Sequence, residues 1–260
     1  MTGALHDRVV IVTGASRRIA IGAAFARRAV ADGAAVLLHT WSPHDAGQPW
    51  GEDPGGPAAL LAELRAAGGR VEHLSADLAD PQAPAAVLEA ARGAFGHVDA
   101  LVANHARSSG QDLEHLTAAE LDLSHAVNTR ATLLLTQAFA AQHDDTRPGG
   151  RVVLFTSGQY HGAMPAELPY IASKAALHGL TRSLAVHLAP QAITVNCVDP
   201  GPNDTGYADE ELRAAVAAAH PGGRWSTPVD TARLVGWLLS DEAGWITGQT
   251  IASDGGWSAR

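Results

Sequence analysis

The chain has 260 residues, of which 46% are hydrophobic and 17% are charged. These values are typical of a globular protein with one large core, and we expect residues 1–260 to form a single α/β domain. The net charge of −9 argues against nucleic acid as the main partner, because phosphate binding needs a basic face. No apolar run reaches the roughly eighteen residues that predict a membrane span, so no membrane partner is expected.

The cysteine count and the first residues indicate a compartment. Cys197 is the only cysteine, which excludes an internal disulfide and fits a reducing environment. The first residues lack the basic region and apolar stretch of a signal peptide. We therefore expect a cytoplasmic protein. The 13 histidines are scattered without the spacing of metal ligands, and we predict no metal site.

Apolar, β-branched runs alternate with helical stretches rich in Ala and Leu along nearly the whole chain. The runs predict strands at residues 9–13, 35–40, 71–74, 100–103, 151–156, 193–198 and 250–252. Helices are expected at residues 21–31, 57–67, 81–95, 118–141, 170–188 and 229–239. This alternation predicts a Rossmann-like, doubly wound parallel sheet of about seven strands with helices on both faces.

Two segments interrupt the alternation. Residues 41–56 are rich in Pro and Gly and carry Trp41 and Trp50, and residues 203–224 include a short helical piece near 209–219. Loops at the carboxyl ends of parallel strands line the ligand crevice. The first segment is therefore either a wall of the site or a surface insertion. The second is expected to be a lid over the substrate.

The turn between the first strand and the first helix is rich in glycine. Such a turn lets backbone N–H groups and the helix N-terminus approach a pyrophosphate. It predicts cofactor contacts from Gly14, Ser16, Arg17, Arg18, Ala20, Ile21 and Gly22. The second strand ends at Thr40 and Trp41 without a carboxylate for the ribose 2′-hydroxyl. With two arginines in the adjacent turn, this pattern favours NADP(H) over NAD(H), with Thr40 and Trp41 as further contacts.

A tyrosine and the sole lysine of the chain form the predicted centre of the chemistry. Tyr170 and Lys174 are four residues apart, which places them on the same face of a helix. A nearby ammonium stabilises the phenolate, so the phenol can exchange a proton closer to neutral pH. A solvated surface pair is the alternative. Ser157, at the end of the preceding apolar strand, is expected to hold a substrate carbonyl oxygen beside the phenol.

These motifs resemble the short-chain dehydrogenase/reductase family, and within it the 3-oxoacyl-reductase-like members. The resemblance covers nearly the whole chain. The glycine turn departs from the family's TGxxxGxG pattern, because it is two residues longer and Ala20 replaces the middle glycine. A similar lengthened turn occurs in the enoyl-reductase branch. The resemblance implies a Ser157, Tyr170 and Lys174 triad, and Asn128 would help to hold a proton-relay water.

The resemblance also implies where the cofactor and the substrate bind. Further cofactor contacts would come from Asp77, Leu78, Asn104, Pro200, Gly201, Asn203 and Thr205, together with Tyr170 and Lys174. Substrate contacts are expected from Ser157, Tyr170 and Tyr207, and from three polar residues that lie between Ser157 and Tyr170 in the sequence: Gln159, His161 and Glu167. The alternative is that these three residues face solvent. Family members are usually homotetramers or homodimers, so a homo-oligomer is expected.

The resulting hypothesis is an NADP(H)-dependent oxidoreductase that interconverts a carbonyl and a secondary alcohol in either direction. The substrate is of the 3-oxoacyl type or is a small polar, sugar-like molecule. Four acids in the expected lid would repel an acidic acyl carrier: Asp204, Asp209, Glu210 and Glu211. Two alternatives remain. One is an enoyl reductase, although that branch has about six residues between its tyrosine and lysine, whereas three residues separate Tyr170 from Lys174 here. The other is a catalytically silent NADP-binding sensor or scaffold on the same fold.

Overall fold

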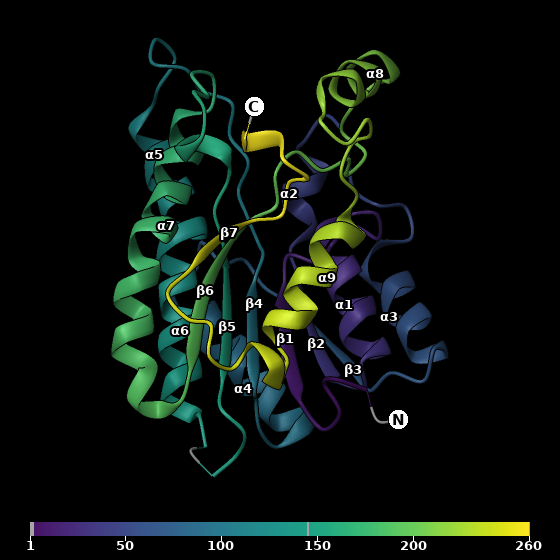
Figure 1. Ribbon diagram of the computed structural model, residues 1–260, viewed down its shortest axis with the longest axis vertical. Coiled ribbons are helices and arrows are strands. Elements are labelled where there is room, and N and C mark those ends of the chain that lie inside the picture. Colours follow the sequence, from purple (N-terminus) through teal and green to yellow (C-terminus); the bar gives the residue numbers. More distant parts are fainter. Residues whose placement is uncertain (1–2, 145, 260) are drawn as a thin grey trace.

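The computed structural model describes residues 3–144 and 146–259. Its strands form a seven-stranded sheet in the order β3-β2-β1-β4-β5-β6-β7, and every neighbouring pair is parallel (Figure 1). The strands are β1 (Val9–Thr13), β2 (Ala35–Thr40), β3 (Val71–Ser75), β4 (Ala100–Ala103), β5 (Arg151–Phe155), β6 (Thr194–Asp199) and β7 (Thr250–Ala252). The predicted doubly wound parallel sheet is confirmed.

Helices cover both faces of the sheet (Figure 1). The helices of one face are α1 (Ile21–Ala31), α3 (Gly56–Ala66) and α9 (Pro228–Leu238). Those of the other face are α4 (Ala83–Phe95), α5 (Ala118–Ser124), α6 (Ala131–Gln142) and α7 (Leu168–Leu188). Among the described residues, no helix combines the length and the apolarity that crossing a bilayer requires.

Each face of the sheet has its own hydrophobic core. Along β1, Val10 and Val12 pack with α1 and α9, whereas Val9 and Ile11 pack with α4 and α6. This division follows from the alternation of side chains along a strand. Because both faces are covered, all five residues of β1 are buried, as the continuous apolar run predicted.

Phe139 of α6 allows a test of the second core, because its side chain is 0% exposed. Replacing Phe139 with Ala is expected to lower the free energy of unfolding by about 3–5 kcal/mol, through lost burial and the cavity left behind. Urea unfolding followed by circular dichroism measures the change. Leu113→Ala, at a side chain that is 78% exposed, is the control and should change stability little. A loss below about 1 kcal/mol for Phe139→Ala would contradict this packing.

The long helix expected at residues 118–141 is interrupted. A π-helical turn, His125–Arg130, separates α5 from α6 and contains Asn128. Such turns occur frequently at functional sites. The segment 41–56 also differs from the expected loop, because it contains the short helix α2 (Ser42–Ala46) with Pro43 in its first turn. Proline fits there because its fixed φ suits the helix and no N–H bond is lost. In the second segment, the short helix α8 (Glu210–Ala219) lies where the sequence predicted one.

Candidate active site

A cleft of about 1240 Å³ runs along the carboxyl ends of the strands. Small-molecule pockets are usually about 300–1,000 Å³, so this cleft has room for more than one small ligand. It brings together most of the predicted site residues: Gly14, Ser16, Arg17, Ala20, Ile21, Trp41, Asp77, Leu78, Asn104, Ser157, His161, Glu167, Tyr170, Pro200, Gly201, Asn203, Thr205 and Tyr207. The other predicted residues lie behind or beside its walls: Arg18, Gly22, Thr40, Asn128, Gln159 and Lys174.

The glycine turn at one end fits a dinucleotide phosphate. Gly14 has a φ of 72°, and a Cβ there would lie 2.6 Å from the Cα of His105. At Gly22 a Cβ would lie 2.4 Å from the Gly14 carbonyl oxygen, so this glycine lets α1 pack closely against the turn. Ala20 precedes α1 and provides no side-chain cap. The first N–H groups of α1 are therefore available to a phosphate, despite the lengthened turn.

Both arginines of the turn are paired with carboxylates of the segment 41–56. Arg17 lies in the cleft wall, with its Nε 3.2 Å from Asp45 Oδ1 and its guanidinium carbon 5.1 Å from the centre of the Trp50 ring. Arg18 donates to Asp53 through its Nε at 2.9 Å and its Nη2 at 2.8 Å. Asp45 and Trp50 both line the cleft, so this segment forms a wall of the site, and sequence analysis missed its two acids.

Thr40 does not reach the cleft. Its side chain is 1% exposed, and its hydroxyl lies 2.8 Å from His73 Nε2 on the neighbouring strand β3. The predicted contact of Thr40 with the cofactor is therefore not supported by its position. His39, the preceding residue, lines the cleft instead, and its Nδ1 accepts from the Gly14 N–H at 3.4 Å. Burial lowers the pKa of His39 to about 4, which keeps the imidazole neutral.

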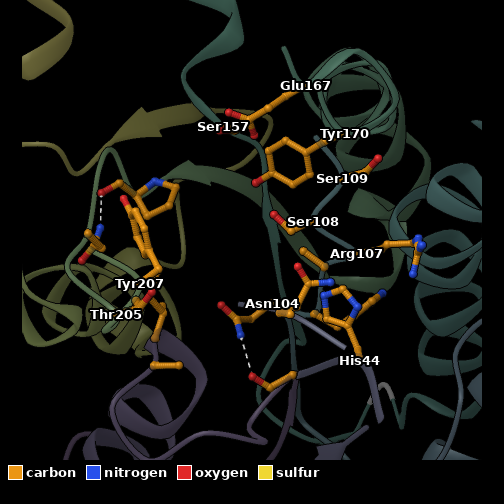
Figure 2. A pocket seen from close by; sticks show the side chains of 18 of the residues that line it. His44, Asn104, Arg107, Ser108, Ser109, Ser157, Glu167, Tyr170, Thr205 and Tyr207 are labelled. Atoms are coloured by element: carbon orange, nitrogen blue, oxygen red, sulfur yellow. Dashed lines mark hydrogen bonds between the residues drawn. The ribbon is translucent and has the colours of Figure 1, made fainter. Parts of the chain in front are cut away.

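Ser157 and Tyr170 meet at the other end of the cleft. Ser157 follows β5, Tyr170 lies in the first turn of α7, and both line the cleft. Figure 2 shows both side chains together at the same wall of the cavity. Burial raises the pKa of Tyr170 to about 12, although the nearby Ser157 hydroxyl opposes that rise. We call this region the tyrosine end of the cleft.

Lys174 lies one helical turn after Tyr170 and behind the cleft wall. It is 2% exposed, its Nζ donates to the Phe155 carbonyl at 3.1 Å, and the same atom lies 5.8 Å from the centre of the Tyr170 ring. Burial lowers the pKa of Lys174 to about 8. The spacing of the two residues predicted that Lys174 would lower the pKa of Tyr170. In the structure that pKa is raised, because the effect of burial is larger than that of any nearby donor.

Asn128 connects two walls of the site. Its buried side chain accepts from the Arg107 N–H at 2.6 Å and donates to Ser173 Oγ at 2.8 Å. Ser173 in turn donates to the backbone carbonyl of Tyr170 at 2.6 Å. Asn128 therefore holds α7 against the loop that follows β4. Gln159 donates to Thr156 Oγ1 at 2.8 Å and lies outside the cleft lining, so its predicted contact with substrate is not supported by its position.

Comparison with known proteins identifies the family. A sequence model described as enoyl-(acyl carrier protein) reductase matches residues 14–258. The chain is 37% identical over 252 residues to the uncharacterized oxidoreductase YjdA of Bacillus subtilis (strain 168), with 96% of this chain and 97% of the relative covered. A short-chain dehydrogenase/reductase from Serratia marcescens has a TM-score of 0.87 at 32% identity, with 98% and 99% covered. The chain belongs to the short-chain dehydrogenase/reductase family.

A second solved structure of this family is similar over the full chain. The angucycline C-6 ketoreductase LanV, with bound NADP, has a TM-score of 0.86 at 30% identity, and 100% of this chain and 99% of that one are covered. The family resemblance seen in the sequence is confirmed. This short-chain dehydrogenase/reductase is an oxidoreductase of a family that binds NAD(P).

Proposed function

We propose that this enzyme uses NADP(H) to interconvert a ketone and a secondary alcohol. The observation that carries the proposal is the Ser157 and Tyr170 side chains facing one end of a cleft whose other end is a glycine turn. A pair of hydroxyls in such a cleft is suited to a carbonyl oxygen. The ketoreductase LanV, which has the same fold, supports this reaction type.

The chain's own residues account for the proton transfer. Ser157 and Tyr170 would donate hydrogen bonds to the carbonyl oxygen, and Tyr170 would then give that oxygen its proton. A pKa of about 12 keeps the phenol protonated and ready to donate at neutral pH. Lys174 would bind the nicotinamide ribose and place a positive charge below the phenol, and Asn128 would hold α7 in position. The bound cofactor supplies the hydride.

The same cleft offers a site for each part of the cofactor. Gly14, Ser16, Ala20 and Ile21 would hold the pyrophosphate, with their backbone supported by Asn104. The Asn104 side chain donates to the carbonyls of Thr13 at 3.1 Å and Gly14 at 3.2 Å. The adenine would lie against Asp77 and Leu78, and the nicotinamide amide against Pro200, Gly201, Asn203 and Thr205.

Arg17 is the proposed contact for the 2′-phosphate of NADP(H), because it lines the cleft close to Trp41 and Trp50. Asp45 competes with that phosphate for the guanidinium. Asp45→Asn is therefore expected to strengthen NADPH binding about fivefold, on the order of 1 kcal/mol, with a smaller effect on NADH. Titration with each cofactor, followed by nicotinamide fluorescence, measures both affinities.

Asp53→Asn is the matched control for Asp45→Asn. Asp53 pairs with Arg18, which does not line the cleft, so the ratio of the two affinities should stay the same. If Asp45→Asn strengthens NADH binding as much as NADPH binding, Arg17 does not select the phosphate.

The charges of the cleft favour a polar, uncharged or cationic substrate over an acidic acyl carrier. Both arginines of its lining are paired, Arg17 with Asp45 and Arg107 with Glu120, at 3.2 and 2.6 Å. Around α8, Glu210 and Glu211 are exposed, which makes the rim acidic. Comparing kcat/KM for neutral polar ketones and for 3-oxoacyl thioesters, with NADPH, tests this preference. Faster reduction of the carrier-bound thioester would contradict it.

A further inference from the structure

Glu167 is an acid without a partner at the tyrosine end of the cleft. It immediately precedes α7 and lines the cleft, and Figure 2 shows its side chain beside Ser157 and Tyr170. The side chain is partly buried, and burial raises the pKa of its carboxyl group. Within residues 3–144 and 146–259, its carboxylate makes no hydrogen bond or ion pair, and it does not cap α7.

The positive charges near the cleft are directed away from Glu167, and Lys174 lies behind the cleft wall, where its Nζ donates to the Phe155 carbonyl at 3.1 Å. Arg107 donates to Glu120 through two nitrogens at 2.6 and 2.7 Å, and Arg17 is paired with Asp45. His161 lies 3.8 Å from another carboxylate, that of Asp199. No described cation is therefore paired with the Glu167 carboxylate.

The wall of the cleft opposite Glu167 carries the hydroxyl group of Tyr207. Tyr207 lies across the cavity from Glu167 in Figure 2 and packs edge-on against Trp225. Burial raises the pKa of Tyr207, and the negative charges of Asp204 and Glu167 raise it further. Asp204 is paired with Arg213 at 2.8 Å and Lys174 lies behind Tyr170, so the unpaired carboxylate that faces the cleft here is that of Glu167, which attracts donors and repels anions.

We infer that Glu167 binds a hydrogen-bond donor of the substrate, an ammonium or hydroxyl group close to the reacting carbonyl, and thereby selects amino- and hydroxyketones over oxo acids. A partly buried carboxylate without a protein partner loses part of its hydration, and a charge-assisted hydrogen bond from the ligand offsets that cost. An anionic substrate would instead meet a like charge beside Tyr170. The inference deepens the proposed ketone reduction and rests on it.

The helix dipole offers a purely structural role for the same residue. A carboxylate at the N-terminus of α7 is stabilised by the dipole even when no ligand is bound. In that case Glu167→Gln would change the stability of the protein and would leave its choice among substrates unchanged. A test must therefore read selectivity and stability separately.

The test uses methyl ketones of one chain length that end in a methyl, hydroxyl, ammonium or carboxylate group. Their affinities are measured by calorimetry on enzyme saturated with NADP⁺, where no reduction takes place. Wild type should bind the ammonium ketone about tenfold more tightly than the methyl ketone, as one charge-assisted hydrogen bond predicts. Glu167→Gln should remove most of that advantage and improve binding of the carboxylate ketone. Glu89→Gln, on the exposed side of α4, removes the same charge away from the cleft and should change none of these ratios.

The outcomes separate this inference from the proposed reaction. If Glu167→Gln weakens all four ketones equally, or only lowers the melting temperature, Glu167 does not select the substrate. Tightest binding of the carboxylate ketone to wild type would also overturn the inference. Turnover with NADPH is measured independently on the same ketones. If the binding order holds but no ketone is reduced, the proposed reaction fails and the inferred binding role of Glu167 is retained.

Discussion

Tyr170→Phe is expected to lower kcat for ketone reduction by about 10²–10⁴-fold, the usual contribution of a general acid or base. The variant keeps the aromatic ring and loses the hydroxyl that faces the cleft beside Ser157. Cofactor affinity should change little, because the glycine turn at the other end of the cleft is not altered. Steady-state NADPH oxidation gives the rate, and fluorescence titration gives the affinity.

Tyr160→Phe provides a matched control for this substitution. Tyr160 packs against His161, which lines the cleft, with the two ring centres 3.8 Å apart. Tyr160 itself does not line the cleft. Its loss of a hydroxyl should leave kcat within about threefold of wild type. A Tyr170→Phe enzyme that keeps more than a tenth of the wild-type kcat would show that another group supplies the proton.

Lys174→Met is expected to lower kcat/KM for reduction by about a hundredfold, because it removes the charge that assists proton donation. The wild-type enzyme should also lose activity as the pH rises through about 8, the pKa of Lys174, as the ammonium becomes neutral. Tyr170 does not cause this loss, because its pKa is about 12 and it remains protonated. The pH profile of the variant should lack the decline near pH 8.

Lys174→Arg distinguishes the effect of the positive charge itself from the effect of its loss as the pH rises. A guanidinium stays charged across this pH range, so this variant should keep more activity than Lys174→Met and show no decline near pH 8. Circular dichroism on each variant checks that the fold is retained. A wild-type profile that is flat through pH 8, or a Lys174→Met profile that keeps the decline, would contradict the assigned role of Lys174.

The sheet could be predicted from the sequence because its signals are local. The run Val9-Val10-Ile11-Val12 is apolar throughout, as a strand covered on both faces requires. The break between α5 and α6 has no such signal. It is stabilised by contacts of Asn128 with Arg107 and Ser173, which are distant in sequence, and helix propensity does not report tertiary contacts.

In the predicted site, too, the residues with a local sequence signal were found, and those placed by contacts distant in sequence were not. Tyr170 and Lys174 were found because residues four apart share one face of a helix. The expected cofactor contact of Thr40 is not supported by its position, because the direction of its side chain depends on how β2 pairs with β3. Asp45 and Asp53 were missed because an irregular segment with no periodic pattern folds back onto the glycine turn.

Reduction of an α,β-unsaturated ketone with NADPH, deuterated at the position that transfers hydride, tests the central claim most directly. Such a substrate offers the enzyme both a carbonyl and a carbon–carbon double bond. The proposed chemistry predicts an alcohol with deuterium on the carbon that bears the hydroxyl, formed by wild type and lost in Tyr170→Phe. Deuterium on the carbon distal to the carbonyl, in a saturated ketone, would contradict it and identify an enoyl reductase.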